Sequence, residues 1–506
     1  MLKLAILLYF VRLCHSSKIL VVFPVPEKRH GILSDSLVKA LLEEGHEMTY
    51  VTKFPQKTKL HNLEYVDISS NIEYDSEHYW PTPENKGNNS LHMENLGLKY
   101  AQRALLHPNM QELMMNTTSS FDLIIAEWFY SGLLAPLSPL YECPLIWYSS
   151  TDVSWKSIGL VSSEVNTLSL YNPGLSIIER IHHFWRQFNE IVQNYYHISS
   201  KELPAYEKSF RDAFKNRERV LPNYETVVHN SSLLFINSHV YLDQLSGLPT
   251  NAKYIGGHHM EEIAQPLPKN LKKIMDDCKD GVIYVDLETR LFSQNLQEFI
   301  MQELIEAFGQ IKQTVIWKYD EILVNLPKNL YTMKRPPQQS ILSHANTVAF
   351  VNLGDLVSII EAAHYGVPVI GIPVMDDQIA HMDSVIEKKW GLKIDFNNKL
   401  SWKILDAIDT IENDKSFLTG AKAAQSILRY RLTTPRKEFQ HWIQMIINTR
   451  GAPHLRSSNP TVSTLEKYNI DIILLVIMLL WFFSKVIKVF KVHFNNTSDD
   501  LDKKDL

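Results

Sequence analysis

The body of the chain alternates short apolar runs with longer segments whose apolar positions recur at helical spacing. Residues 19–25 form a valine-rich run of strand length, and residues 34–46 repeat leucines at helical spacing before stopping at Gly45. Residues 48–54 have the pattern of a second strand. A strand, a helix and a strand in this order predict a parallel sheet covered by helices.

The same alternation continues along the chain and starts again near Pro249. The first half contains further expected strands at 121–127 and 144–150, then a longer, more polar helical insertion at 166–224. The second half contains expected strands and helices at 281–287, 293–311, 314–319, 346–352, 357–366 and 367–373. The pattern predicts two α/β domains in series, at 18–248 and 249–450. Their cleft is expected at the carboxyl ends of the strands, where parallel sheets bind ligands.

The two ends of the chain have patterns of their own. Residues 1–17 combine Lys3, an apolar run and small residues near a cleavage point, which predicts a signal peptide, although a buried first strand is the competing interpretation. Residues 468–490 predict one transmembrane helix, with a buried core helix as the alternative. The uninterrupted apolar run is short, so Lys485 and Lys488 would have to extend towards the membrane surface.

The lysines after this run predict that residues 491–506 form a cytosolic tail. Lys503 and Lys504 resemble a dilysine signal for return to the endoplasmic reticulum. We therefore expect a single-pass type I protein of the endoplasmic reticulum membrane with a lumenal body. Sequons at Asn88, Asn116 and Asn230 would then face the lumen and carry glycans.

The net charge gives no indication of nucleic-acid binding, and the cysteines leave disulfide pairing open. The 506 residues carry a net charge of −5, so no basic excess indicates nucleic acid as a partner. The chain has 3 cysteines, and Cys14 lies in the expected signal peptide. Whether Cys143 and Cys278 pair is left open by the sequence.

Several segments together resemble one family. They are FPVPEKRHGIL near the start, FDLIIAE, GVIYVDLET, RPPQQSILSH, and above all FVNLGDLVSIIEAAHYGVPVIGIPVMDDQ at 350–378. The chain resembles the animal UDP-glycosyltransferases of the UDP-glucuronosyltransferase-like group, and insect members in particular. The resemblance implies a GT-B fold, in which two Rossmann-like domains face a cleft. It also implies a UDP-sugar co-substrate in the C-terminal domain, a small lipophilic acceptor in the N-terminal domain, inversion at the anomeric carbon, and no metal or further cofactor. Homo- or hetero-oligomers are possible.

The resemblance assigns a catalytic pair to His30 and Glu127. His30 follows the first strand and matches the family's base, and an imidazole of ordinary pKa accepts a hydroxyl proton at neutral pH. Glu127 ends a strand at the family's acidic position, where aspartate is usual, and a carboxylate there would orient the ring. The competing interpretation is a loop histidine and a solvated strand end, each without a task.

At the donor site the match is mixed. Residues with an expected donor-binding role are Gln338 beside uracil, Ser358 at phosphate, Glu361 at ribose, and Asp377 and Gln378 at the sugar. Arg335 replaces the tryptophan that stacks on uracil, and Thr289 replaces a serine that cradles phosphate. The altered donor-site positions are Asp286, Glu288, Leu353 in place of a histidine, Asp355 in place of a glycine, and His381 in place of an asparagine.

These changes predict weaker donor binding. Two like charges about 4 Å apart repel by about 4 kcal/mol at an effective dielectric of about 20, or about a thousandfold in affinity. Carboxylates at Asp286, Glu288 and Asp355 would therefore oppose a diphosphate, and Leu353 offers it no donor. Three hypotheses remain: an active hexosyltransferase with an altered donor site; a non-catalytic relative acting as a binding or regulatory subunit; and a site in which the carboxylates recruit a divalent cation. Alternatively the carboxylates point to solvent.

Overall fold

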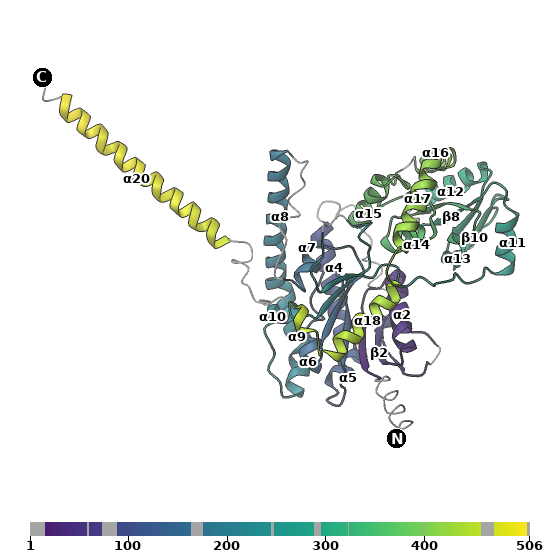
Figure 1. Cartoon of the computed structure of the whole chain (residues 1–506), viewed down its shortest axis with the longest axis horizontal. Helices are drawn as coiled ribbons and strands as arrows, with labels where there is room; N and C mark the ends of the chain where they lie inside the picture. Colours follow the sequence, from purple (N-terminus) through teal and green to yellow (C-terminus); the bar gives the residue numbers. More distant parts are fainter. Residues whose placement is uncertain are drawn as a thin grey trace.

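The computed structural model shows two α/β domains beside each other, each built on a parallel sheet (Figure 1). The structure describes residues 16–502 except 58–59, 73–88, 163–175, 244–246, 288–294, 322, 398 and 457–469. The expected signal peptide therefore lies outside the described residues apart from Ser16 and Ser17. The prediction of two parallel α/β units is confirmed, since every strand pair in both sheets is parallel.

The N-terminal sheet has the order β3-β2-β1-β4-β5-β6-β7. Its strands are β1 (Lys18–Phe23), β2 (Glu47–Thr52), β3 (Leu63–Asp67), β4 (Leu123–Trp128), β5 (Leu145–Ser149), β6 (Leu233–Ile236) and β7 (Ala252–Tyr254). The strand order reverses between β1 and β4, which is where a parallel sheet opens a crevice for ligands. Because β1 and β4 are hydrogen-bonded neighbours, the segment after β1 and the end of β4 lie close together.

The helices of this domain are α2 (Lys28–Glu43), α4 (Asn89–Leu105), α5 (Pro108–Met115), α6 (Leu137–Tyr141), α7 (Trp155–Gly159), α8 (Ile177–His197), α9 (Leu203–Asn216) and α10 (Tyr224–Val228). Helix α2 begins earlier than the leucine pattern predicts. Its N-cap, Glu27, has extended backbone, and the helix starts at the next residue, Lys28. His30 consequently lies on the first turn of α2 and not in a loop.

The C-terminal sheet has the order β10-β9-β8-β11-β12-β13. Its strands are β8 (Val282–Asp286), β9 (Thr314–Lys318), β10 (Leu330–Met333), β11 (Thr347–Asn352), β12 (Val369–Gly371) and β13 (Gly391–Lys393). Its helices are α11 (Lys269–Asp277), α12 (Asn295–Gln310), α13 (Gln338–Leu342), α14 (Leu356–Tyr365), α15 (Asp376–Glu387), α16 (Leu400–Asn413) and α17 (Lys415–Arg429). Here the order reverses between β8 and β11, and Asp286 pairs in register with Asn352 at their carboxyl ends.

The chain crosses back to the N-terminal domain at its last body helix, α18 (Pro435–Asn448). Phe439, Ile443 and Ile446 on α18 are fully buried in the apolar cluster that also contains Ile19 of β1. Val357 of α14 joins the same cluster. The two domains thus share one apolar cluster, which holds their sheets in a fixed relation around the crevice.

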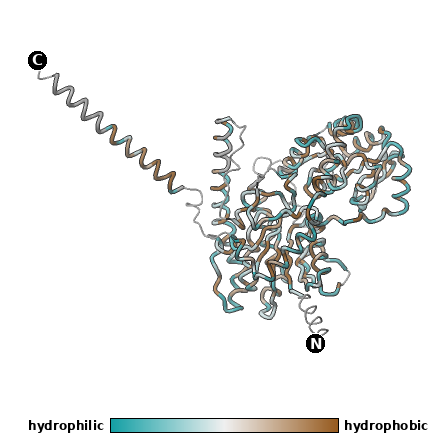
Figure 2. Tube along the Cα trace, viewed as in Figure 1, coloured by the Kyte–Doolittle hydropathy of each residue, from teal (hydrophilic) through white to brown (hydrophobic). Residues whose placement is uncertain are grey.

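Two helices project from the body in Figure 1: α8, and the long helix α20 (Ile470–Asp502). Figure 2 shows hydrophobic residues along the part of α20 nearer the body, where the large apolar side chains from Ile472 to Phe483 are exposed. Among the described residues no helix is both long enough and apolar enough to cross a membrane. The expected span at 468–490 is therefore not confirmed. Cys143 and Cys278 are free thiols.

Candidate functional site

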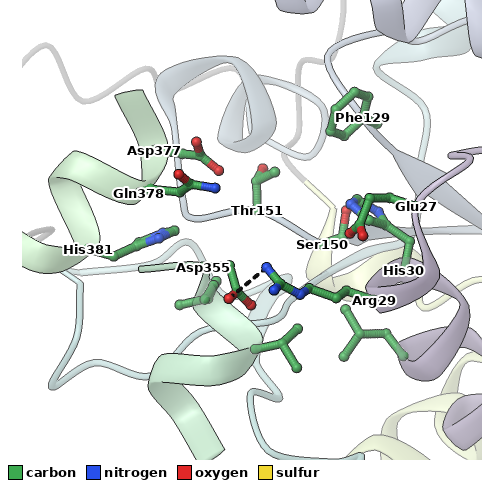
Figure 3. Close-up of a pocket in the computed structure, with 13 residues that line it drawn as sticks. Glu27, Arg29, His30, Phe129, Ser150, Thr151, Asp355, Asp377, Gln378 and His381 are labelled. Atoms are coloured by element: carbon green, nitrogen blue, oxygen red, sulfur yellow. Dashed lines mark ion pairs between the residues drawn. The ribbon is translucent and has the colours of Figure 1, made fainter. Parts of the chain in front are cut away.

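A pocket opens between the two domains at the carboxyl ends of both sheets (Figure 3). One wall comes from the loop before α2, the start of α2, and the ends of β4 and β5. The other comes from the N-terminal ends of α14 and α15. The lining residues are Glu27, Arg29, His30, Leu33, Phe129, Ser150, Thr151, Asp355, Leu356, Val357, Asp377, Gln378 and His381. Four of the site positions predicted from the sequence besides His30 therefore reach this pocket: Asp355, Asp377, Gln378 and His381.

His30 and Glu127 form a direct pair. The Nδ1 of His30 lies 2.5 Å from Oε1 of Glu127, whose side chain is fully buried near the end of β4. Since Nδ1 is held by the carboxylate, Nε2 is the ring nitrogen left for a substrate.

The surroundings set the basicity of His30. Burial alone lowers the pKa of this imidazole, but the charge and hydrogen bond of Glu127 outweigh burial, and Glu27 and Asp377 add to them, so the pKa is raised. The ring also packs edge-on against Phe129, with centroids 5.5 Å apart. Phe129 belongs to a small apolar cluster with Val25, Leu96 and Tyr100. A base of raised pKa thus lies between a carboxylate and an apolar wall.

Arg29, which the sequence reasoning missed, reaches across the crevice from the same turn of α2. Its NH1 lies 2.7 Å from Oδ2 of Asp355, the contact drawn as a dashed line in Figure 3. Its NH2 lies 3.7 Å from Oδ2 of Asp286. Lys318 at the end of β9 is 2.9 Å from the same oxygen of Asp286. Asp286 and Asp355 are therefore each paired with a cation and do not point to solvent.

This cluster changes the charge argument made from the sequence. The repulsion expected of Asp286 and Asp355 assumed unpaired carboxylates, whereas Arg29 and Lys318 balance their two charges. The only signal in the sequence is that Arg29 precedes the candidate base, and adjacency on a helix does not reveal a partner in another domain. Glu288 and Thr289 lie outside the described residues.

The turn before α14 positions Asp355. Asp355 is the N-cap of α14 and its Oδ1 accepts from the backbone N–H of Ser358 at 3.0 Å. Gly354 before it has φ +80°, a conformation that a side chain would strain. Leu353 does not line the pocket. Its side chain is fully buried in the apolar core between the sheet and α12 and α16. The effect of this leucine on donor binding stays a prediction.

A second ion pair crosses the crevice at His381. Its Nε2 lies 2.6 Å from Oδ2 of Asp152, in the segment after β5, and its Nδ1 donates to the carbonyl of Gly354 at 2.9 Å. Burial lowers the pKa of His381, but the Asp152 charge and hydrogen bond dominate and raise it to about 9. Burial in turn raises the pKa of Asp152, and His381 more than reverses this. His381 is therefore a cation at neutral pH, and sequence reasoning missed Asp152 as well.

Asp377 and Gln378 begin α15 and point into the pocket beside Thr151 (Figure 3). Burial raises the pKa of Asp377, partly offset by His381. The Oε1 of Gln378 accepts from the backbone N–H groups of Val374 and Met375 at 2.9 and 3.2 Å, so this oxygen orders the turn. Besides His381, the carboxylate of Asp377 and the amide nitrogen of Gln378 are the polar groups of this helix at the pocket.

The remaining predicted donor residues lie deeper or outside. Gln338 donates to Oε2 of Glu361 at 2.5 Å and accepts from the hydroxyl of Tyr284 at 3.1 Å. The other oxygen of Glu361 accepts from Gln339 and lies 3.3 Å from His259. Gln338, Glu361 and Ser358 are not among the residues that line the pocket, and Arg335 is exposed. The structure thus joins Gln338 to Glu361 without joining either to the pocket itself.

Among the described residues no group of three or more histidine, cysteine or acidic side chains is arranged to hold a metal ion. Asp286 and Asp355, the carboxylates considered for that role, share Arg29 as a partner. A cation site at these two residues would need to displace a guanidinium first, and the donor set present does not favour it.

Comparison with known proteins bears on this geometry. Residues 102–504 match the family model described as UDP-glucoronosyl and UDP-glucosyl transferase. Similar proteins include UDP-glucosyltransferase 2 of Dactylopius coccus, 28% identical over 501 residues that cover 96% of this chain and 95% of the relative. An ecdysteroid UDP-glucosyltransferase of Spodoptera littoralis nuclear polyhedrosis virus is 21% identical and covers 97% and 100%.

Solved structures agree on the fold. The glycosyltransferase of kitacinnamycin superposes with a TM-score of 0.56 at 16% identity, covering 85% of this chain and 99% of that one. A calicheamicin glycosyltransferase gives a TM-score of 0.55 at 17% identity, covering 87% and 100%. The architecture is that of a GT-B fold with two parallel Rossmann-like sheets. The chain belongs to the UDP-glucoronosyl and UDP-glucosyl transferase family.

Proposed function

We propose that the chain transfers a hexosyl group from a UDP-sugar to the hydroxyl of a small lipophilic acceptor, with inversion at the anomeric carbon. The observation that carries the proposal is the 2.5 Å contact between His30 and Glu127 at the edge of an interdomain pocket. A buried imidazole whose one nitrogen is fixed by a carboxylate and whose other nitrogen faces a pocket is suited to general base catalysis.

The chemistry requires a neutral His30. The Nδ1–H of its ring donates to Glu127, so the lone pair of Nε2 accepts the acceptor's hydroxyl proton as the oxygen attacks the anomeric carbon. The bond from that carbon to the UDP oxygen breaks, and its electron pair leaves with UDP. Glu127 stabilises the imidazolium that forms. A single displacement places the new bond opposite the leaving group, which is why inversion is expected.

The lipophilic acceptor is supported by the apolar side of the site. Phe129 packs against His30 and is stacked with Tyr100, with centroids 6.2 Å apart. An acceptor whose hydroxyl reaches Nε2 of His30 would lie along this wall, and its apolar surface would leave water there. The particular acceptor and the particular hexose are not specified by these contacts.

We further propose that α20 holds the chain at the endoplasmic reticulum membrane with the body lumenal. The support is the run of exposed apolar side chains in the first half of α20, which water solvates poorly, together with the lysines after it. Partition of the full chain with microsomes after an alkaline carbonate wash tests this proposal. Release into the supernatant would contradict it.

A second candidate function is a non-catalytic member with impaired UDP-sugar binding, acting as a binding or regulatory subunit. One observation favours it: the backbone N–H of Ser358 at the start of α14 is already taken by Asp355. A diphosphate at this helix N-terminus would have to displace that carboxylate.

The deciding experiment is calorimetric titration of the full chain with UDP and with UDP-glucose, followed by a transfer assay with a panel of lipophilic alcohols and phenols. Binding with turnover supports the transferase. Binding without turnover, or no binding, supports the second candidate. Both arms are repeated with magnesium and manganese, and binding only with metal would revive the divalent cation that the arrangement of Asp286 and Asp355 disfavours.

A further inference from the structure

The basic side chains that line the pocket differ in how many donors they can offer a ligand. Both ring nitrogens of His381 are engaged, one by Asp152 and one by the carbonyl of Gly354. His30 has one nitrogen on Glu127, and the other is needed for the acceptor. Arg29 carries a planar guanidinium with several N–H donors in a fork that fits phosphate oxygens. Within the pocket lining, Arg29 is thus the cation suited to an anionic ligand.

Arg29 currently faces groups that resemble such a ligand. The side chain of Arg29 is only 12% exposed, and its guanidinium contacts the carboxylate of Asp355 across the crevice (Figure 3) and lies 3.7 Å from that of Asp286. Asp355 in turn sits at the N-terminus of α14 as its N-cap. A carboxylate held between a helix N-terminus and an arginine occupies the kind of position that a phosphate takes.

Each of these carboxylates keeps a partner if Arg29 turns to a ligand. Asp355 retains the backbone N–H of Ser358 at 3.0 Å. Asp286 retains Lys318 at 2.9 Å. An exchange of Arg29 from its carboxylates to a diphosphate therefore leaves Asp286 with an ammonium and Asp355 with a hydrogen bond at a helix N-terminus, which lowers the cost of such a movement. The hydroxyl of Ser358, fully buried and without a hydrogen-bond partner among the described residues, lies on the same first turn of α14.

We propose that Arg29 is the residue with which this chain binds the diphosphate of its nucleotide sugar, and that Asp355 is the internal anion that the diphosphate displaces from it. The inference rests on the proposed function, because it specifies how the same pocket takes its donor. It also places the cation for the leaving group one residue before the base. The two reacting partners are then set by one rigid helical turn.

Calorimetry on the full chain tests this with UDP and uridine as probes, since only UDP carries the diphosphate. We expect Arg29→Gln to lower UDP affinity about tenfold or more and to leave uridine affinity unchanged. Arg29→Lys should recover part of the loss. Lys39→Gln is the matched control, because Lys39 is also on α2 and pairs across the domain interface with Glu261 at 3.0 Å, away from the pocket. It should leave both affinities unchanged.

Arg29→Gln alone also uncovers the charge of Asp355, so the effect is repeated in an Asp355→Asn background. We expect Asp355→Asn to raise UDP affinity, and Arg29→Gln added to it to lower that affinity about tenfold again. Asp286 still has Lys318 in this background and needs no screening by Arg29. Equal UDP affinity with and without Arg29 in the Asp355→Asn chain overturns the inference and reduces Arg29 to a bridge between domains.

Failure of the proposed function has a different signature. If the unmodified chain binds neither UDP nor UDP-glucose, the transferase proposal fails. The inference then stands only if Asp355→Asn confers UDP binding that Arg29→Gln abolishes. If Asp355→Asn confers no UDP binding on that chain, the inference about Arg29 fails together with the transferase proposal. If the unmodified chain binds UDP and Arg29→Gln changes nothing in either background, the inference alone falls. Circular dichroism and a melting curve for every variant confirm that the fold is retained.

Discussion

The pairs His30–Glu127 and Arg29–Asp355 start from adjacent residues of α2 and differ in which domain supplies the partner. Glu127 comes from β4, the hydrogen-bonded neighbour of the strand that leads into α2. Asp355 comes from the cap of α14 in the other domain. The first pair is fixed by the register of one sheet. The second depends on how two separate sheets are held together, and α18 is the element that bridges them.

This difference separates the tasks of the two pairs. A base and its orienting carboxylate need constant geometry, which neighbouring strands provide. A contact across a crevice closes it when empty and must open when a ligand enters. The pair His30–Glu127 is therefore suited to stay in place, whereas the pair Arg29–Asp355 is the one suited to exchange partners.

The largest expected effect comes from removing the fixed pair's base. His30→Ala should lower turnover by about a thousandfold, because no other pocket side chain can take the acceptor proton from the same position. The measurement is kcat/KM with a responsive acceptor found in the transfer assay. UDP affinity should stay close to that of the unmodified chain, since His30 is assigned to the acceptor.

A matched control is Ser36→Ala on the same helix, whose hydroxyl contacts the backbone of His258 outside the pocket and should not matter for turnover. Full activity of His30→Ala would remove this histidine from the mechanism and leave the fixed pair as a structural feature.

Leu353, in the turn before α14, tests the C-terminal side of the crevice in a different way. The family resemblance suggests that Leu353→His restores a phosphate donor, whereas the buried position predicts destabilisation. Placing an imidazole among Ile370, Ile404 and their neighbours should lower the free energy of unfolding by about 3 kcal/mol. Denaturant titration measures it, and Leu353→Met should cost less than about 1.5 kcal/mol. A stable Leu353→His chain with tighter UDP binding would show that the turn rearranges towards the pocket.

Much of the fold was predictable because it depends on local patterns. Valine-rich runs and leucines at helical spacing located β1, β2 and β8 and indicated two parallel α/β units, and the segment at 350–378 indicated the family. The pairing of His30 with Glu127 needs only neighbouring strands, because α2 follows β1 and Glu127 lies near the end of β4. These features are set within one domain, by spacing that the sequence displays directly.

The contacts of Arg29 with Asp286 and Asp355 and of Asp152 with His381 were not predictable, because each joins residues of different domains. The sequence shows only the charge of each substituted residue. No motif links Arg29 to Asp286 or Asp355, or Asp152 to His381. The side chain of Leu353 faces the core, because one step along an extended segment turns a side chain from one face to the other. The sequence pattern predicts which residues form a turn, but only the three-dimensional structure shows which way each side chain faces.

Glu127→Gln probes how the fixed pair sets basicity. The amide keeps the shape of the side chain but removes the charge that raises the pKa of His30, so that pKa should fall. The acidic limb of kcat/KM against pH should move to lower pH, because His30 must be neutral to act as a base. The plateau rate should drop about a hundredfold, since the imidazolium loses its counter-charge. An acidic limb of kcat/KM that does not move would show that another group controls it. The control is Glu127→Asp, which restores the usual family residue and should keep the original limb.

The smallest effect concerns the second crossing pair, Asp152–His381, and pH. His381 has a folded pKa of about 9 against an ordinary value of 6.5, so its contribution to stability is complete below pH 6.5 and is lost as the pH rises through 9. We expect the free energy of unfolding to fall by about 2 kcal/mol over this range, less than the full shift implies because Asp152 is partly exposed. Denaturant titrations at several pH values measure the loss. His381→Asn, which places the family's residue in the crevice, removes the titrating group. The difference in free energy of unfolding between the unmodified chain and His381→Asn should therefore shrink towards high pH. If this difference in free energy of unfolding stays constant with pH, His381 is neutral in the folded chain. Its contact with Asp152 is then a hydrogen bond without an ion pair.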